Sequence, residues 1–427
     1  MGESGSFRVP LEEWRVKKSI SISLLDQALL SAFNLLLNLA LIRFAGTVEF
    51  GKFTIVATFI LVFSSIQNAL TNLPISVLLP ARPETEHAGL LSDLVSFDAL
   101  TRIAMALAVL MACAWIDHDP LFLVAAAAAV YSTLTRETMR AICVARGRID
   151  QCFAIDAVAV AVSAVAAGML ALTMAPQTAC LAGIATGNLA AALVYGGRLL
   201  PKRLPYAEAI ARYRSYWPDT RWSLTGAAAT EAEYRAYVFA LQGFRGTAAL
   251  GNVQAGRLLM GPLNLFAQAW GRVARPRMAA ALAGANGAVA LKILWQGLAL
   301  VLVIAATYLA CLYLAWSWLE PVIYRGKYTD IGLIAAAWAV YTLLNVAQIC
   351  IGILVQAAYR LRELAYVSIG AGLVSLLLLL ALASNVHAVY AVLAITCGEV
   401  VGLVWLIWLA LRIARDAQTS GLSESRS

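Results

Sequence analysis

The sequence predicts an all-α polytopic membrane protein, with about 12 transmembrane helices in two six-helix lobes around a central cavity. Three observations support this fold class. Hydrophobic residues make up 61% of the chain and charged residues 13%, whereas soluble domains have about half and about a quarter. Apolar stretches of membrane-spanning length recur along the whole chain, and the longest polar break lies near its middle.

The apolar stretches are long enough for helices that cross a hydrocarbon core of about 30 Å, which takes about 20 residues each. In chain order, we expect spans at Ile20 to Ile42, Phe53 to Leu79, Leu94 to Ile116, Leu121 to Val144, Phe153 to Leu172, Ala179 to Gly197, Trp222 to Leu241, Ala248 to Trp270, Ile293 to Trp316, Ile331 to Val355, Leu364 to Leu382 and Ala388 to Leu411. The first of these is too long for the core of a signal peptide, so we expect it to stay in the mature protein.

The distribution of Lys and Arg predicts the orientation of these spans, because cytoplasmic loops are enriched in both residues. If the N-terminus is cytoplasmic, the outer breaks carry few of the 32 Lys and Arg residues, namely Arg43, Lys52, Arg245, Arg325 and Lys327. Both termini are therefore expected in the cytoplasm. The net charge of +8 is explained by this topology and by attraction to anionic headgroups, without nucleic-acid binding.

The polar break from Arg198 to Arg221 divides the chain into two halves of the same orientation. We expect an N-terminal lobe at 1–197, a cytoplasmic linker at 198–221, a C-terminal lobe at 222–411 and a cytoplasmic tail at 412–427. The stretches FAGTVEFG at 44–51 and FRGTAALG at 244–251 lie at equivalent turns of the two halves. They indicate a parallel pseudo-repeat, in which glycines supply positive φ, Thr47 and Thr247 cap the next helices, and Pro74 and Pro262 bend them.

Ionisable residues inside the spans are candidates for function, because each costs at least about 2.5 kcal/mol to insert into a bilayer. Arg235 and Arg257 are expected to line the cavity and bind substrate, since a guanidinium matches a phosphate bidentately. Glu231 or Glu233 is the candidate for binding a coupling proton or sodium ion, and the sequence does not choose between these ions. Glu231 and Arg235 are four residues apart, so a purely structural salt bridge is the alternative for that pair.

A second charged group lies in the predicted cytoplasmic half of spans three and four. Asp98 and Arg102 are also four residues apart, and with Arg136 and Glu137 they are candidates for a cytoplasmic gate. Arg140 is expected to extend to the interface instead.

Polar side chains form a helical stripe on the first span: Gln27, Ser31, Asn34 and Asn38. Such a stripe faces protein or water and not lipid. Asn34 and Asn38, together with Gln67 on the second span, are predicted to line the substrate cavity. The 7 cysteines and 3 histidines show no spacing typical of a disulfide framework, a metal site or a catalytic site.

Three stretches carry a resemblance to a known family: LLDQALLSAFNLLLNLALIRFAGTVEFGKFTIV, TRETMRAICVARGRIDQCFAIDA and ALGNVQAGRLLMGPLNLFAQAWGRVARPRMAAALA. Over essentially its whole length the chain resembles the Wzx-type polysaccharide flippases of the MOP superfamily, which serve O-antigen and exopolysaccharide synthesis. The resemblance implies a multi-pass protein of the bacterial inner membrane that moves an undecaprenyl-diphosphate-linked oligosaccharide to the outer leaflet by alternating access. It also implies membrane lipids and polysaccharide polymerase or other assembly proteins as partners, and no cofactor besides a coupling proton or sodium ion.

Two other classes stay open at this point. A multidrug or cation exporter of the related multidrug-extrusion branch would share the helices, but would favour acidic cavity residues over arginines. A membrane glycosyltransferase or polymerase would be an enzyme with a large outer loop, and the longest outer break, around LEPVIYRGKYTD, is short.

Overall fold

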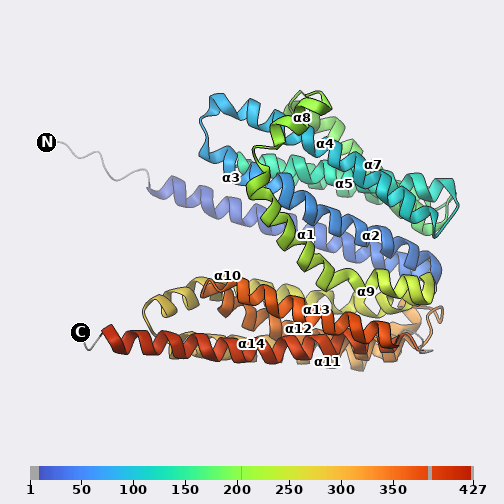
Figure 1. Cartoon of the computed structure of the whole chain (residues 1–427). Coiled ribbons are helices and arrows are strands. Elements are labelled where there is room, and N and C mark those ends of the chain that lie inside the picture. The colour runs from blue at the N-terminus through green and yellow to red at the C-terminus, as the bar shows by residue number, and fades with distance from the viewer. Residues whose placement is uncertain (1–8, 203, 383–386, 425–427) are drawn as a thin grey trace. The chain divides into compact units, whose positions relative to one another are not determined.

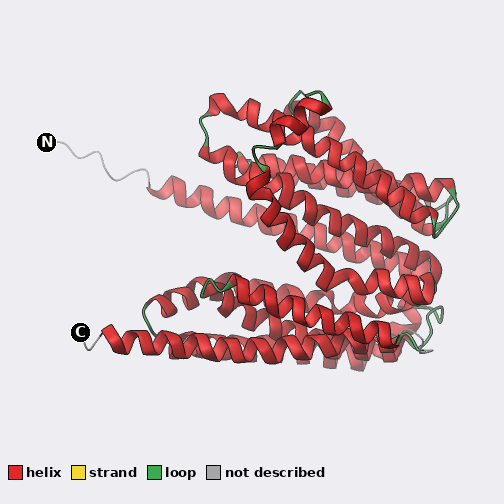
Figure 2. Cartoon of the chain, in the orientation of Figure 1, coloured by secondary structure: helices red, strands yellow, loops and turns green. Residues whose placement is uncertain are grey.

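The computed structural model describes residues 9–202, 204–382 and 387–424, and within these the side chains outside 9–20, 233, 361 and 419–424. Every regular element in the described residues is a helix (Figures 1 and 2). The chain divides into two compact units. The first consists of Met1–Ala45 with Lys52–Ala228, and the second of Gly46–Gly51 with Ala229–Ser427.

The first unit is built mainly from α1 (Val9–Phe44), α2 (Thr47–Gln67), the π-helical segment η1 (Asn68–Asn72), α3 (Leu73–Ala81), α4 (Glu84–Ala114), α5 (Pro120–Ala145), α6 (Ile149–Leu170), α7 (Pro176–Leu199) and the short α8 (Tyr206–Tyr213). Helix α7 packs against both α5 and α6, and α4 packs against α5. Their core is apolar and includes Leu94, Ile142 and Ile155.

The second unit is built from most of α9 (Trp217–Arg257), the 3₁₀ turn η2 (Leu258–Met260), α10 (Gly261–Ala283), α11 (Gly287–Ile323), α12 (Ile331–Ala357), α13 (Leu361–Leu382) and α14 (Val389–Glu424). Helix α14 packs against α12 and α13, and α10 packs against α11 and α12. Leu263, Leu294 and Val346 lie in its core. Helix α9 is interrupted at Gly246, whose φ of 79° and ψ of 177° are not helical, so the predicted spans seven and eight meet there.

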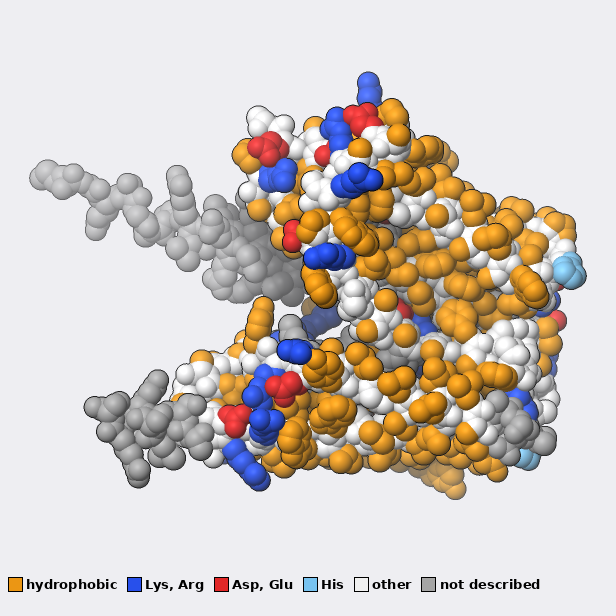
Figure 3. Space-filling view, viewed as in Figure 1, with side chains coloured by type: hydrophobic (Ala, Val, Ile, Leu, Met, Phe, Trp, Pro, Cys, Tyr) orange, Lys and Arg blue, Asp and Glu red, His pale blue; other side chains and the backbone are white. Residues whose placement is uncertain are grey.

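Nine helical segments of the described residues are long and apolar enough to cross a membrane. They coincide with nine of the expected spans. The other three expected spans are also helical, on α5 and across α9, η2 and α10, but they carry charged residues such as Arg136, Glu231 and Arg257, which lower their hydropathy. Hydrophobic side chains cover most of the face of each unit in view (Figure 3), as expected for a surface in contact with lipid.

The second glycine of each repeat, Gly51 or Gly251, serves close packing and not turn geometry. A Cβ atom on Gly51 would overlap the carbonyl oxygen of Thr247, and one on Gly251 would overlap that of Thr47. Gly46–Gly51 belongs to the second unit, so the two copies of the repeat contact each other reciprocally within it. The predicted positive φ is therefore wrong for Gly51 and Gly251, and of the described glycines in the repeat only Gly246 has it.

The ends of these helices differ in detail from the prediction. The carboxylate of Glu49 accepts a hydrogen bond of 3.0 Å from the Gly46 N–H and so caps α2. Pro74 and Pro262 each lie in the first turn of a new helix, directly after η1 and η2. A proline lacks the N–H that would continue the preceding helix, so both spans change their helical geometry just before it.

Candidate functional site

Each unit contains a polar cavity. The cavity of the first unit, which we call the α1–α5 cavity, has a volume of about 580 Å³. Its wall includes the predicted stripe of α1 and polar residues of α5 and α7: Gln27, Ser31, Asn34, Asn38, Thr133, Arg136, Glu137, Arg140 and Asn188. The structure thus places Asn34 and Asn38 at a cavity wall, on the same cavity as Arg136 and Glu137.

The arginines of the α1–α5 cavity are neutralised by carboxylates from three helices. Arg140 contacts Asp156 of α6 at 2.8 Å and Asp26 of α1 at 3.0 Å, as well as Glu137. Arg136 contacts Glu137 at 3.0 Å and Asp156 at 3.5 Å. Arg140 was expected to extend to the interface, but three acidic partners hold it within the unit. We call these five residues the α1–α5–α6 ion network.

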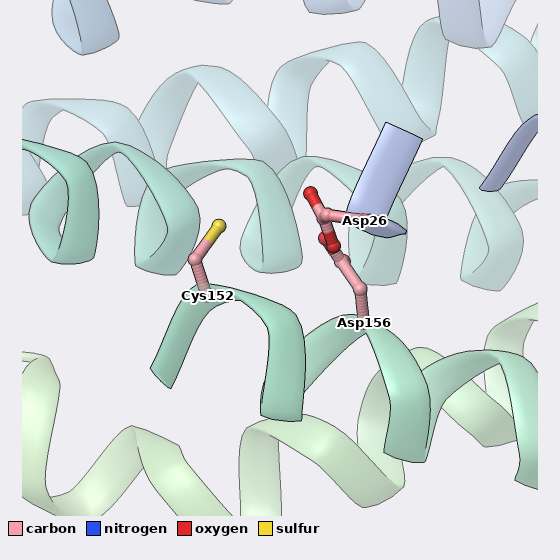
Figure 4. Close-up of side chains that lie close together, drawn as sticks. All are labelled: Asp26, Cys152 and Asp156. Atoms are coloured by element: carbon pink, nitrogen blue, oxygen red, sulfur yellow. The ribbon is translucent and has the colours of Figure 1, made fainter. Parts of the chain in front are cut away.

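Three potential metal ligands meet at this network (Figure 4). Oxygens of Asp26 and Asp156 and the sulfur of Cys152 lie within 4.8 Å of one another, and the two carboxylates point toward each other in the figure. Sequence spacing did not predict this cluster because Asp26 is on a different helix. The guanidinium groups of Arg136 and Arg140 already pair with Asp156, so their positive charge opposes a divalent cation there.

A second network lies deeper in the first unit. Asp98 and Arg102 form the predicted ion pair at 3.1 Å, and both side chains are 0% exposed. Asp98 accepts hydrogen bonds from the Gln67 amide at 2.8 Å and from the Thr138 hydroxyl at 2.7 Å. Gln67 was predicted to line the substrate cavity, but it is fully buried in this network, where its amide nitrogen donates hydrogen bonds to Asp98, Thr138 and the Leu134 carbonyl.

The structure distributes the four gate candidates over both networks. Asp98 and Arg102 join α4 to α2 and α5, whereas Arg136 and Glu137 join α5 to α6 and the cavity. Only Arg136 and Glu137 therefore lie at a cavity wall.

The second unit contains the α10–α12 cavity, of about 470 Å³. Its polar wall comes from four helices: Thr230 and Tyr234 of α9, Gln268, Arg272 and Arg275 of α10, Gln348 and Gln356 of α12, and Ser368 of α13. None of the described side chains that line it is a carboxylate, and the side chain of Glu233 on α9 lies outside the described residues. The sequence did not single out Arg272 or Arg275.

The two arginines predicted to bind substrate lie elsewhere in the second unit. Arg257 donates a hydrogen bond of 2.7 Å to the Tyr237 hydroxyl and stacks over Trp338 at 5.1 Å. Arg235 pairs with Glu231 on the same helix. The second predicted ion ligand, Glu233, has its side chain outside the described residues. Neither Arg235 nor Arg257 is among the residues that line the α10–α12 cavity.

One acidic residue near Arg257 was missed by the sequence interpretation. Glu399 of α14 is buried and accepts a hydrogen bond of 3.1 Å from Asn345 of α12. It also attracts Arg257 electrostatically. The signal was present in the sequence, because Glu399 is an acidic residue in the middle of the last apolar stretch.

An ion pair joins the N-terminal part of α2 to the loop between α4 and α5. The Lys52 ammonium lies 2.7 Å from the Asp117 carboxylate. Burial raises the pKa of Asp117, but the hydrogen bonds from Lys52 and from the backbone N–H of Asp119 outweigh it and hold that pKa below its ordinary value. The carboxylate is thus charged at neutral pH and ties the two segments together.

No family model and no curated protein matches the sequence. Among solved structures, the chain is similar to the lipid II flippase MurJ in an inward closed conformation, with a TM-score of 0.69 and 12% identity over 95% of this chain and 90% of that one. It is also similar to an inward-facing multidrug resistance MATE family transporter of the MOP superfamily, with a TM-score of 0.69 and 11% identity over 90% of this chain and 94% of that one.

A third similar structure is a MOP superfamily transporter from Pyrococcus furiosus described as having a binding pocket of reverse polarity, with a TM-score of 0.56 and 13% identity over 93% of this chain and 96% of that one. Identities this low show the fold and not the substrate. The chain is an all-helical multi-pass protein with the fold of the MOP superfamily transporters.

Proposed function

We propose that the protein is a flippase that translocates an undecaprenyl-diphosphate-linked oligosaccharide across the bacterial inner membrane for polysaccharide synthesis. The observation that carries this proposal is a polar cavity in each unit in which arginines stand among amide and hydroxyl side chains. Arginines suit phosphate, and amides and hydroxyls suit sugar. The lipid tail needs no polar site, because it can stay in the bilayer.

The fold supports a transporter over an enzyme. The similar structures are named as flippases or transporters. Transporters built from two helical repeats commonly work by alternating access, in which the binding site opens first to one side of the membrane and then to the other. We infer the same principle here, with both termini in the cytoplasm, as the loop charges indicate. Membrane lipids and polysaccharide polymerase or other assembly proteins are the proposed partners.

Coupling to a proton is the second part of the proposal. The α1–α5–α6 ion network contains the carboxylates Asp26, Glu137 and Asp156 but only two arginines. One acidic charge is left over, and a single proton shared by Asp26 and Asp156 would neutralise it. We propose this network as the proton-binding site in place of Glu231, because Glu231 already forms an ion pair with Arg235.

A multidrug or cation exporter is the second candidate function. The same acidic excess in the first unit favours it, since a cationic drug could take the place of the proton. The similarity to a multidrug resistance transporter is as close as that to the lipid II flippase. The α10–α12 cavity favours an anion instead, because the described side chains that line it include two arginines and no carboxylate.

The two functions differ in what a cell lacking the protein would accumulate. We expect deletion of the gene in its native bacterium to abolish surface polysaccharide and to leave lipid-linked oligosaccharide on the cytoplasmic leaflet, with unchanged sensitivity to cationic drugs. Normal polysaccharide together with increased drug sensitivity would favour the exporter instead.

A further inference from the structure

We propose that the α10–α12 cavity is the subsite for the sugar–diphosphate junction of the substrate, with Arg272 and Arg275 holding the phosphates. The proposal rests on the proposed function and deepens it, because it assigns the polar head of the substrate to one cavity of one unit. It also moves the predicted anion site from Arg235 and Arg257 to residues that the sequence did not single out.

The charge of the cavity is the first argument. Arg272 and Arg275 lie three residues apart on α10, a spacing that puts both side chains on one face of the helix. Neither side chain makes a hydrogen bond or an ion pair with the described part of the chain, and none of the described side chains that line the cavity is a carboxylate. In the α1–α5 cavity, by contrast, Arg136 and Arg140 are matched by carboxylates. The unneutralised positive charge is therefore in the α10–α12 cavity.

The neutral wall is the second argument. The side chain of Gln348 is 8% exposed, it lines the cavity, and its Oε1 atom has no hydrogen-bond partner within the described residues. A buried amide oxygen without a partner destabilises the protein, and a ligand hydroxyl that donates to it would remove that cost. Gln268, Gln356 and Ser368 add further donors and acceptors on the same wall.

The arginines and the neutral polar side chains together define the class of ligand. Two arginines on one face of α10 match the two charged groups of a diphosphate better than a single ammonium group would. The amides and the serine match a hydroxyl-rich ring and not a hydrocarbon chain. The volume of about 470 Å³ lies within the range of about 300–1,000 Å³ typical of sites for drug-sized ligands. The fit is to the first sugar of a glycan together with its diphosphate.

Binding to purified full-length protein tests the assignment. The probes are undecaprenyl diphosphate and undecaprenyl diphosphate N-acetylglucosamine, titrated into protein held in phosphatidylcholine nanodiscs. We expect Arg272→Ala and Arg275→Ala each to weaken the binding of both probes by about tenfold, the loss typical of removing one charged hydrogen-bonding partner. Lys at either position should restore only part of this loss.

Matched variants separate the cavity from general charge effects. Arg277 is exposed on α10, as Arg272 and Arg275 are, but it is not among the residues that line the cavity, so Arg277→Ala should bind both probes as the wild type does. Gln348→Leu should weaken the binding of the sugar-bearing probe several-fold and leave the binding of undecaprenyl diphosphate unchanged. Thermal unfolding in the nanodisc checks that each variant is folded.

Two further arms distinguish other sources of phosphate. Inorganic pyrophosphate should compete with undecaprenyl diphosphate, whereas replacing phosphatidylcholine by phosphatidylglycerol should not abolish probe binding. If phosphatidylglycerol abolishes it, the arginines bind ordinary lipid headgroups and the proposal is wrong. If folded Arg272→Ala and Arg275→Ala bind and flip both probes as the wild type does, the subsite assignment fails while the proposed function stands. A wild type that neither binds nor flips them contradicts the proposed function itself.

Discussion

Arg257 combines two contacts that hold a guanidinium in one orientation. The Tyr237 hydroxyl accepts its hydrogen bond, and Trp338 lies under its planar face. Tyr237 also accepts a hydrogen bond of 2.7 Å from the Gln254 amide, so the acceptor is itself fixed. A charged side chain supported in this way is pre-organised, and only part of its hydrogen-bonding capacity is used.

For Arg257 we predict that substitution by Ala reduces polysaccharide export by at least about tenfold, because a charged donor is lost. Substitution by Lys should rescue only partly, since an ammonium lacks both the fork of donors and the flat face that stacks on Trp338. Arg235→Ala, tested in parallel, should also reduce export. Surface polysaccharide is measured together with the amount of protein in the membrane. Normal polysaccharide in the Ala variants would show that neither guanidinium takes part in transport.

Asp156 provides the test of proton coupling. Asp156→Asn removes the unmatched acidic charge of the α1–α5–α6 ion network, so we expect transport in proteoliposomes to lose its dependence on an imposed pH gradient. Cys152→Ala is the matched variant, because Cys152 is a metal-type ligand in the same cluster but contributes no carboxylate. It should keep the full response. Loss of the response in Cys152→Ala and not in Asp156→Asn would exclude the shared proton.

Sequence spacing predicted two ionic contacts within one helix and missed those between helices. Asp98–Arg102 and Glu231–Arg235 follow from a separation of four residues and are present. The contact of Arg140 with Asp26 depends on how α5 packs against α1, which periodicity does not contain. For the same reason Gln67 could be predicted as polar and inward, but not as bonded to Asp98 in preference to lining a cavity.

At the scale of helices, the first turns of α2 and of the segment after Gly246 pack closely against each other. This packing is possible because residues 51 and 251 are glycines without a side chain. Gly51 and Gly251 each face a carbonyl oxygen of the other repeat, at Thr247 and Thr47. The recurrence of the motif in the sequence is thus explained by a reciprocal contact between its two copies. The pattern predicted the equivalence of the two turns, but their direct contact requires the three-dimensional structure.

Gly251→Ala should destabilise the protein by about 1–3 kcal/mol, because the new methyl group has to displace the backbone of Thr47. Gly243→Ala is the control, since Gly243 is helical and a Cβ there meets nothing within 4 Å. That change should be neutral or stabilising by up to about 1 kcal/mol. Thermal unfolding of both purified variants measures the difference. Equal stability of the two would contradict the close approach.

The Lys52–Asp117 pair gives a pH-dependent contribution to stability. The pKa of Asp117 is lowered in the folded protein, so the contribution is fully present above the ordinary carboxyl pKa of about 3.9 and is lost as the pH falls through the lowered value. We expect Asp117→Asn to unfold at a lower temperature than the wild type near neutral pH, with the difference shrinking at about pH 3 and below. If the difference in unfolding temperature between the two proteins does not change with pH, the charge of Asp117 does not contribute to stability.

For the whole molecule, composition and apolar length were sufficient to predict the class of fold. All twelve predicted spans are helical in the structure, although only nine segments of the described residues meet the criteria for a span by length and hydropathy. The remaining three carry charged residues of the candidate sites, among them Arg136, Arg235 and Arg257. The same charges that suggest function therefore weaken the signal of a membrane span.

The charge asymmetry between the units was not predicted from the sequence. Asp26 and Asp156 pair with Arg140 in the first unit, and the sequence did not identify them as its partners. What distinguishes the second unit is a cavity whose arginines have no acidic partner among the described side chains that line it. Neutralisation depends on which helices are neighbours, and this information is absent from a single sequence.

The most direct test of the central claim is a flipping assay with the wild-type protein in proteoliposomes. Undecaprenyl diphosphate carrying a fluorescent oligosaccharide is incorporated, and a membrane-impermeant quencher reports the fraction in the outer leaflet over time. The account predicts protein-dependent translocation of this lipid, and none of a cationic dye in the same vesicles. Movement of the dye without movement of the lipid would contradict it.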